Sequence, residues 1–186
     1  MINKDTKQKL SGLTVLLHWL VGLVIITLTV IGVYMSENEV FALYPIHKSI
    51  GVLIFTVIVI RVYWRFVNGW LQPAANYTKI EHNLSKIVHW VLIIAMIVMP
   101  ISGFIMSGTG GHGVSVFGLE IVAANFDLVA KKAIAYNAAL AGFMHSTHVN
   151  SGWVMIIAIF LHLMGAIKHH FMDKDSTLKR MFGKRI

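Results

Sequence analysis

The chain has 186 residues, of which 56% are hydrophobic and only 13% are charged, with a formal net charge of +8. This composition lies outside the range of soluble globular domains and indicates a single integral membrane domain over residues 1–186. The chain contains no cysteine, which excludes disulfides, iron–sulfur clusters and covalently attached haem, so that any redox centre must be held by histidine, methionine or carboxylate.

Four segments are long and apolar enough to cross a hydrocarbon core, which requires about 20 residues. In chain order the predicted membrane helices cover residues 13–35, 47–67, 86–107 and 148–171. Pro45 marks the beginning of the second helix, because proline is not tolerated in a helix interior. The sequence therefore predicts an all-α, four-helix transmembrane bundle, and an even number of crossings places both termini on one side.

The basic residues predict which side that is. Every lysine and arginine except Lys48, Lys131 and Lys132 lies in the N-terminal tail, around the connection between the second and third helices, or toward the C-terminal end. By the positive-inside rule both termini are cytoplasmic, and the loops at residues 36–46 and 108–147 face outward. Topology and anionic lipid head groups account for the net positive charge, which therefore does not indicate a nucleic-acid partner.

The outer loop at residues 108–147 is longer than a connector requires, which predicts a cap over something buried. Its first part, GTGGHG, is predicted to be flexible, and VSVFGLEIVAANFD is predicted to form short strands or turns. The following stretch, AKKAIAYNAALAGFMHSTH, has a helical pattern over residues 130–148. The fourth helix is therefore expected to begin before the membrane.

Two histidines in the fourth predicted helix, His148 and His162, lie fourteen residues apart. A helix separates them by about 21 Å along its axis and by roughly 40° around it, so both rings face the same side. Counted from the helix ends, His18 matches the depth of His162, and His47 matches the depth of His148. One imidazole on each of two facing helices is the arrangement that holds a b-type haem. The pattern predicts two non-covalent b haems, one above the other across the membrane, with these four histidines as iron ligands.

Other histidines have competing interpretations. His89 lies closer to the helix end than His18 and is predicted to occupy a haem edge or a quinone site. The alternative is that His89 binds the iron in place of His18. His145 lies one turn before His148 and is the alternative outer ligand. The remaining histidines outside the predicted spans or at a span end are expected to be solvated or interfacial: His82, His112 and His170.

Glycine follows each proposed ligand by about one helical turn, at Gly22, Gly51, Gly152 and Gly165. A flat porphyrin requires close approach of the backbone, which glycine permits. The alternative explanation is ordinary small-residue packing between membrane helices.

Arg61 lies fourteen residues after His47 and therefore near the level of the predicted inner haem. Its guanidinium suits the carboxylates of haem propionates. The alternative is that Arg61 extends to the lipid head groups and anchors the helix, as is predicted for Arg65.

Several stretches of the chain resemble the bacterial cytochrome b561 family. They are HW at His18, IHKSIGVLIF at the second helix, VHW at the third, and HVNSG, FLH and KHHFMDKDSTLKRM toward the end. The resemblance covers nearly the whole chain and implies a four-helix inner-membrane cytochrome with two b haems. In such a cytochrome, the residues matching His47 and His148 bind the outer haem. The residues matching His18 and His162 bind the inner haem. It also implies electron transfer between an outward donor and the quinone pool.

The resemblance leaves the electron donor open. Superoxide is the first choice because one branch of the family oxidises it and reduces ubiquinone, and because the few outward lysines can attract a small anion. The quinone, ubiquinone or another, is expected near His89, Lys168 and His169. The alternative for His169 is that it simply lies at the membrane interface. A conduit subunit that docks a separate periplasmic redox protein is the second hypothesis. A divalent-metal transporter is the third, and it requires carboxylates that the cores of the spans lack.

Overall fold

The computed structural model describes residues 4–75 and 77–186, and its main elements are four long helices. They are α1 (Gly12–Glu37), α2 (Tyr44–Asn68), α3 (Lys79–Thr109) and α4 (Ala138–Phe171), and each is long and apolar enough to span a membrane. A 3₁₀ turn, η1 (Phe41–Leu43), precedes α2, and a short helix, α5 (Thr177–Met181), follows α4. The predicted four-helix transmembrane architecture is confirmed.

Local sequence explains where these helices begin. The side chain of Ser11 accepts a hydrogen bond from the backbone of Thr14 at the beginning of α1, and Thr78 and Glu81 form a reciprocal capping box on α3. Pro45 occupies the first turn of α2, as predicted, because a missing N–H is tolerated there. These caps satisfy backbone donors that the first helical turn leaves without partners.

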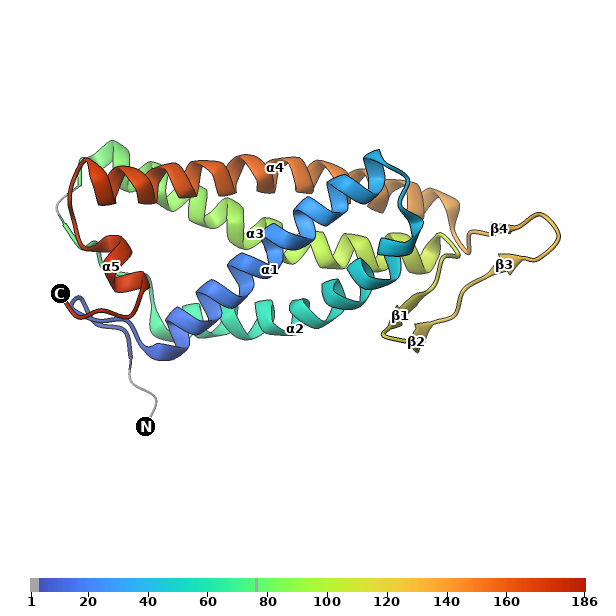
Figure 1. Cartoon of the computed structure of the whole chain (residues 1–186), viewed down its shortest axis with the longest axis horizontal. Helices are drawn as coiled ribbons and strands as arrows, with labels where there is room; N and C mark the ends of the chain where they lie inside the picture. Colours follow the sequence, from blue (N-terminus) through green and yellow to red (C-terminus); the bar gives the residue numbers. More distant parts are fainter. Residues whose placement is uncertain (1–3, 76) are drawn as a thin grey trace.

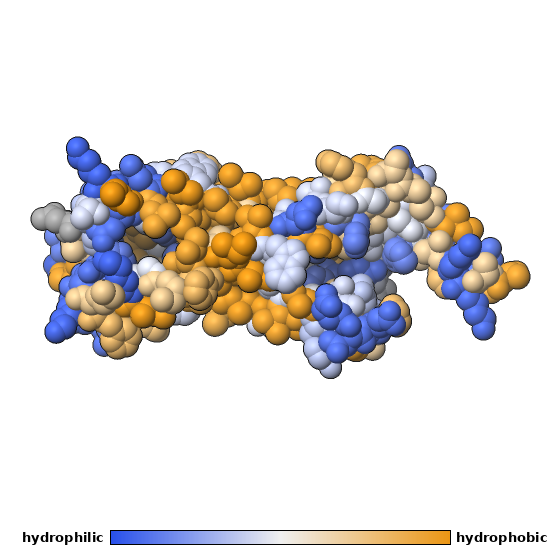
Figure 2. All heavy atoms as spheres, turned by 90° about the horizontal axis from the view of Figure 1, so that it is seen from above, coloured by the Kyte–Doolittle hydropathy of each residue, from blue (hydrophilic) through white to orange (hydrophobic). Residues whose placement is uncertain are grey.

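The helices form an elongated bundle in which α3 and α4 run side by side in opposite directions (Figure 1). Residues from all four helices form the buried core, including Val21, Ile58, Met96 and Met155. Many large apolar side chains on the outside remain exposed, and Figure 2 shows hydrophobic residues over the middle of the molecule. Such a surface matches a lipid environment, in which apolar side chains face outward.

The two ends of the bundle differ, and we call them the termini end and the hairpin end. At the termini end, the backbone N–H of Ile186 donates to the carbonyl of Gln8 at 3.0 Å, so the N-terminal tail and the C-terminus lie together. Hydrophilic residues gather at this end in Figure 2. The connections α1–α2 and α3–α4 lie at the opposite end.

The α3–α4 connection carries two antiparallel hairpins. The first pairs β1 (Val114–Val116) with β2 (Leu119–Val122), and the second pairs β3 (Phe126–Asp127) with β4 (Lys132–Ala133). Phe117 and Gly118 both have positive φ, which suits the tight turn between β1 and β2. The second hairpin projects beyond the helices in Figure 1. The short strands predicted for VSVFGLEIVAANFD, residues 114–127, are confirmed as β1, β2 and β3.

The helical prediction for residues 130–148 is wrong at its beginning. Residues 132–133 form β4, and α4 begins only at Ala138, with Asn137 as its N-cap. The Asn137 side chain accepts a hydrogen bond from the backbone of Leu140. This contact stabilises a helix that begins after Asn137 rather than one that runs through it. The expectation that this helix begins well before His148 is nevertheless confirmed.

Candidate functional site

At the hairpin end, His47 from α2 faces His148 from α4. Their ring centres lie 6.5 Å apart with a steep interplanar angle. An imidazole nitrogen binds a transition metal at about 2 Å, so two rings on opposite sides of one metal have centres about 6 Å apart. The spacing of this pair fits two ligands of one iron.

The hydrogen bonds of His148 select the ring nitrogen that is available to a metal. Its Nδ1 lies 2.9 Å from the carbonyl oxygen of Met99 and 3.2 Å from the hydroxyl of Ser102. Because a carbonyl only accepts, Nδ1 carries the hydrogen and donates it, which leaves the lone pair on Nε2. A hydrogen bond of this kind orients metal-bound histidines.

Two glycines provide the space that these rings occupy. A Cβ at Gly32 would lie 3.2 Å from Cε1 of His47, and one at Gly103 would lie 3.0 Å from Cε1 of His148. The Nδ1 atom of His47 is buried and has no hydrogen-bond partner among the described residues. Neither glycine could be recognised from the sequence, because a glycine on one helix that accommodates a ring on another leaves no pattern along the chain.

The two rings line a largely apolar cavity between the helices. Gly51 of α2 and Val114 of β1 also contribute to its wall, and the space amounts to about 660 Å³ when the part open to the surroundings is included. Lys48 also lines it, and its amine donates to the carbonyl of Gly113, the residue before β1, at 2.9 Å. The first hairpin therefore covers this cavity, as the length of the loop predicted.

At the termini end, three histidines and an arginine come together. The ring centres of His18 and His162 are 6.1 Å apart, and those of His89 and His162 are 5.2 Å apart. Of the two pairs, His18 with His162 comes closer to the spacing of about 6 Å expected for two rings on one metal. Both predicted pairs are therefore adjacent, and His89 joins the second of them.

Hydrogen bonds complicate the choice of ligand at the termini end. Nη2 of Arg61 lies 3.1 Å from Nδ1 of His18, and a guanidinium only donates, so Nδ1 of His18 accepts here. Iron coordination through Nε2 by a neutral ring would require this contact to be replaced. The Nδ1 of His89 lies 2.6 Å from the carbonyl of Ser85 and leaves its Nε2 free.

The position of Arg61 distinguishes it from Arg65. Arg61 points into the bundle, where Nη1 also contacts the sulfur of Met96 at 3.9 Å. Arg65 instead forms an ion pair of 3.3 Å with Asp5 in the N-terminal tail. Of these two arginines, Arg61 is therefore the one that lies within reach of a group bound between the helices.

Most of the glycines predicted one turn from the ligands have open space next to their Cα atoms. Among the described residues, a Cβ at Gly22, Gly51 or Gly165 would meet no atom within 4 Å, whereas one at Gly152 would meet the side chain of Met99 at 3.7 Å. Three of the four positions thus leave room for a flat group against the backbone. The histidines and this space together fit a haem.

Lys168 and His169 lie at the end of α4 and face carboxylates. The Lys168 amine donates to Glu81 and to Asp173, at 2.8 Å in both cases. Nδ1 of His169 lies 3.0 Å from an oxygen of Asp173 and 3.0 Å from an oxygen of Asp175. Two of the three residues predicted for a quinone site, Lys168 and His169, thus belong to a charged network at the termini end.

Tyr77 and Thr177 extend this network beyond the membrane-spanning helices. Burial raises the pKa of the Tyr77 hydroxyl, which stays protonated and donates to Asp175 at 2.9 Å. Burial also opposes ionisation of Asp175, but hydrogen bonds donated by Thr177 and Tyr77 outweigh it and hold the pKa of this carboxyl below its ordinary value. Asp175 is therefore ionised at neutral pH.

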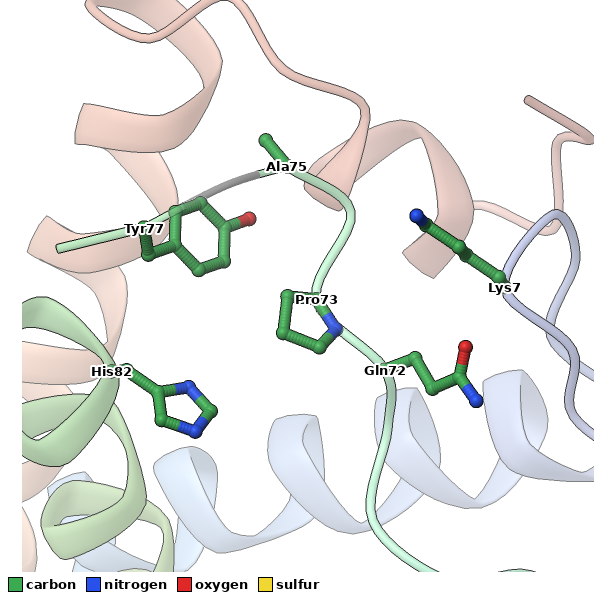
Figure 3. Close-up of a pocket in the computed structure, with 6 residues that line it drawn as sticks. All are labelled: Lys7, Gln72, Pro73, Ala75, Tyr77 and His82. Atoms are coloured by element: carbon green, nitrogen blue, oxygen red, sulfur yellow. The ribbon is translucent and has the colours of Figure 1, made fainter. Parts of the chain in front are cut away.

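His82 belongs to neither histidine pair. It lines a surface pocket at the termini end, where it and Lys7 lie on opposite sides of the opening (Figure 3). His145 and His112 are exposed at the hairpin end, and His170 packs against the neighbouring Phe171 ring.

Comparison with known proteins agrees with this geometry. Residues 9–184 match the family described as prokaryotic cytochrome b561. The chain is 31% identical to cytochrome b561 homolog 2 of Escherichia coli (strain K12), over 97% of this chain and 94% of that relative. It is 29% identical to the probable superoxide oxidase CybB of Yersinia pestis, over 96% and 98%, and 23% identical to cytochrome b561 homolog 1 of Escherichia coli (strain K12), over 96% and 99%. The chain therefore belongs to the prokaryotic cytochrome b561 family, whose members are membrane electron-transfer proteins with b-type haem.

Proposed function

We propose that this protein carries electrons across the bacterial inner membrane, from a periplasmic donor at the hairpin end to a quinone at the termini end. His47 with His148, and His18 with His162, would each hold one non-covalent b haem. The observation that carries the proposal is the two ring pairs, at 6.5 and 6.1 Å, at two levels of one bundle. Bound haem supplies reversible one-electron chemistry at iron.

The assignment of sides rests on charge. Basic residues surround the termini end, and the positive-inside rule places such an end in the cytoplasm. Reporter fusions after Ile186 and within residues 127–131 would test this orientation. Activity of a cytoplasmic reporter only at Ile186 is expected, and the reverse pattern would contradict it.

The haem assignment can be tested at His148 with a matched control. Reduced-minus-oxidised spectra and haem content per chain are compared for His148→Ala and His145→Ala, two histidines one turn apart on α4. We expect two haems per chain in the wild type and in His145→Ala, and one or fewer in His148→Ala. Equal haem content in the two variants would refute the ligand role of His148.

The choice between His18 and His89 needs its own comparison. The ring spacing favours His18, so His18→Ala should lose the inner haem, whereas His89→Ala should keep two haems with an altered spectrum or potential. Loss of haem only in His89→Ala would make His89 the ligand. In the haem-loaded protein, Arg61 is expected to leave His18 and pair with propionates, and Arg61→Gln should therefore shift the potential of the inner haem.

We place the quinone, ubiquinone or another, at the termini end near His89, Lys168 and His169. His89 adjoins the proposed inner haem ligands, and the charged network around Lys168 is in reach of cytoplasmic protons. Replacing Lys168 by Met should raise the KM for a soluble quinone, whereas Lys86→Met on α3 should not. Equal KM values in both variants would remove Lys168 from the quinone site.

Superoxide is our first choice of donor, and the naming of one relative as a probable superoxide oxidase supports it. Two superoxide anions would each lose one electron and leave as O₂, while one quinone gains two electrons and two protons to form a quinol. Lys131 and Lys132 are exposed on the second hairpin and can attract the anion. Haem reduction by superoxide should therefore slow as ionic strength rises, and a flat profile would exclude steering by charge.

A conduit subunit with a separate periplasmic redox partner is the second candidate. The tip of the second hairpin favours it, because Leu128 and Val129 are 83% and 95% exposed beside two lysines. Co-purification of a redox protein from native membranes, lost when Leu128 and Val129 are changed to Ser, would support this candidate over the first. Full superoxide:quinone turnover by the purified chain alone would favour the first.

A further inference from the structure

A second group of metal-ligating side chains lies outside both histidine pairs. It consists of Nδ1 of His169 and one carboxylate oxygen each from Asp173 and Asp175, and these atoms all lie within 4.8 Å of one another. His169 belongs to the last turn of α4, and the two aspartates belong to the turn that leads to α5. The group therefore sits where the chain leaves the membrane at the termini end.

The backbone brings these residues together. The N–H of Asp173 donates to the carbonyl of Lys168 at 3.1 Å, and that of Asp175 donates to the carbonyl of His169 at 3.0 Å. Between the two aspartates, Lys174 adopts a φ of +50°, which reverses the chain. Both carboxylates consequently face the same imidazole.

The His169 ring nitrogen faces both carboxylates without an aligned hydrogen bond to either. Nδ1 is buried and makes no aligned hydrogen bond among the described residues, although one oxygen of Asp173 and one of Asp175 each lie 3.0 Å away, at ion-pair distance. Buried polar atoms in proteins usually have an aligned partner, and a cation between this nitrogen and the two oxygens would bind all three. Two donors at right angles on a metal with bonds of about 2.1 Å lie about 3.0 Å apart, which is the distance from His169 Nδ1 to each carboxylate oxygen.

Charge and surrounding hydrogen bonds also suit a cation. Two carboxylates balance the charge of a divalent ion, since Glu81 offsets the charge of the neighbouring Lys168. Tyr77 donates to Asp175 at 2.9 Å, and Lys168 donates to Asp173 at 2.8 Å, so both carboxylates are oriented by neighbours as metal ligands commonly are. The Asp173 side chain is 31% exposed, which provides a route from solvent.

We propose that His169, Asp173 and Asp175 bind a first-row divalent cation through one nitrogen and two oxygens. This mixed donor set suits Zn²⁺ or Mn²⁺ better than Mg²⁺ or Ca²⁺, which prefer oxygen ligands alone. The cation joins the end of α4 to the turn before α5. It uses Nδ1 of His169 and leaves Nε2 for other partners, such as the quinone that we place near this residue, so metal binding is measured separately from haem content and from electron transfer.

The experiment uses the purified, haem-loaded protein in detergent, treated with a chelator to remove loosely held metal. Equilibrium dialysis against Zn²⁺, and separately Mn²⁺, is followed by elemental analysis of the metal alongside haem iron. We expect one tight equivalent of at least one of these metals in the wild type. In His169→Ala and Asp175→Asn its affinity should fall at least about tenfold, since each variant removes a ligand.

His170→Ala is the matched control, because it removes the adjacent imidazole from the same helix end and should leave metal affinity unchanged. Unaltered haem spectra in all variants show that the bundle is intact and separate this test from that of the proposed function. Absence of tight Zn²⁺ and Mn²⁺ binding would overturn the proposal and leave a protonated His169 paired with the two carboxylates. Equal metal affinity in His169→Ala and His170→Ala would overturn it as well.

Discussion

Gly103 offers a sharp test of how the hairpin-end site is held, because it can be enlarged without changing a proposed ligand. In Gly103→Ala the new Cβ would lie 3.0 Å from Cε1 and 3.2 Å from Nδ1 of His148, whereas ordinary contacts begin at 3.4 Å. The ring must therefore move by several tenths of an ångström. It cannot do so freely, since its Nδ1 is held at 2.9 Å from the Met99 carbonyl.

Metal sites tolerate displacements of only about 0.2 Å, so this shift should weaken haem binding by His148. Loss of a neighbour that orients a metal ligand typically costs about 10- to 100-fold in affinity, which corresponds to roughly 1.4 to 2.7 kcal/mol, and we expect Gly103→Ala to fall in this range. The helix itself should not suffer, because alanine favours an α-helix by about 1 kcal/mol over glycine.

The assay is titration of the haem-free protein with hemin, followed by spectra that distinguish the two haems. Gly103→Ala should bind one haem normally and the other weakly. Gly142→Ala is the control, since a Cβ there would meet nothing within 4 Å. Two haems bound by Gly103→Ala with wild-type affinity and potentials would refute the idea that Gly103 makes room for His148.

Three further predictions concern the termini end, and thermal unfolding in detergent measures each. Asp5→Ala removes the acceptor of hydrogen bonds from the N-terminal turn of α1 and the partner of Arg65, and it should cost about 2 kcal/mol, whereas the control Glu37→Ala should cost little. Thr78→Ala removes the capping box of α3 and should cost about 1 kcal/mol; restoration by Thr78→Ser would show that the hydroxyl matters. Trp19→Phe removes a hydrogen bond of 2.7 Å to the carbonyl at the end of α5, and a loss of about 1 kcal/mol is expected, so unchanged stability would argue against this anchor.

The membrane helices were predictable because the length and hydropathy of a segment can be read directly from consecutive residues. Spans of about 20 apolar residues were sufficient to locate α1 to α4, and the helical period was sufficient to place His148 and His162 on one face. The beginning of α4 was less predictable. Residues 130–137 have helical composition, but the strand pair β3–β4 and the cap at Asn137 determine their structure.

The pairing of histidines at two levels likewise followed from sequence, since depth can be counted from the ends of each span. Sequence alone does not specify how far each helix is rotated about its own axis, or which neighbour it meets. Only the tertiary structure therefore brought Gly103 and the Met99 carbonyl to His148, placed Arg61 on His18, and added His89 beside His162. These contacts join residues that lie tens of positions apart, and their side-chain directions depend on the packing of all four helices.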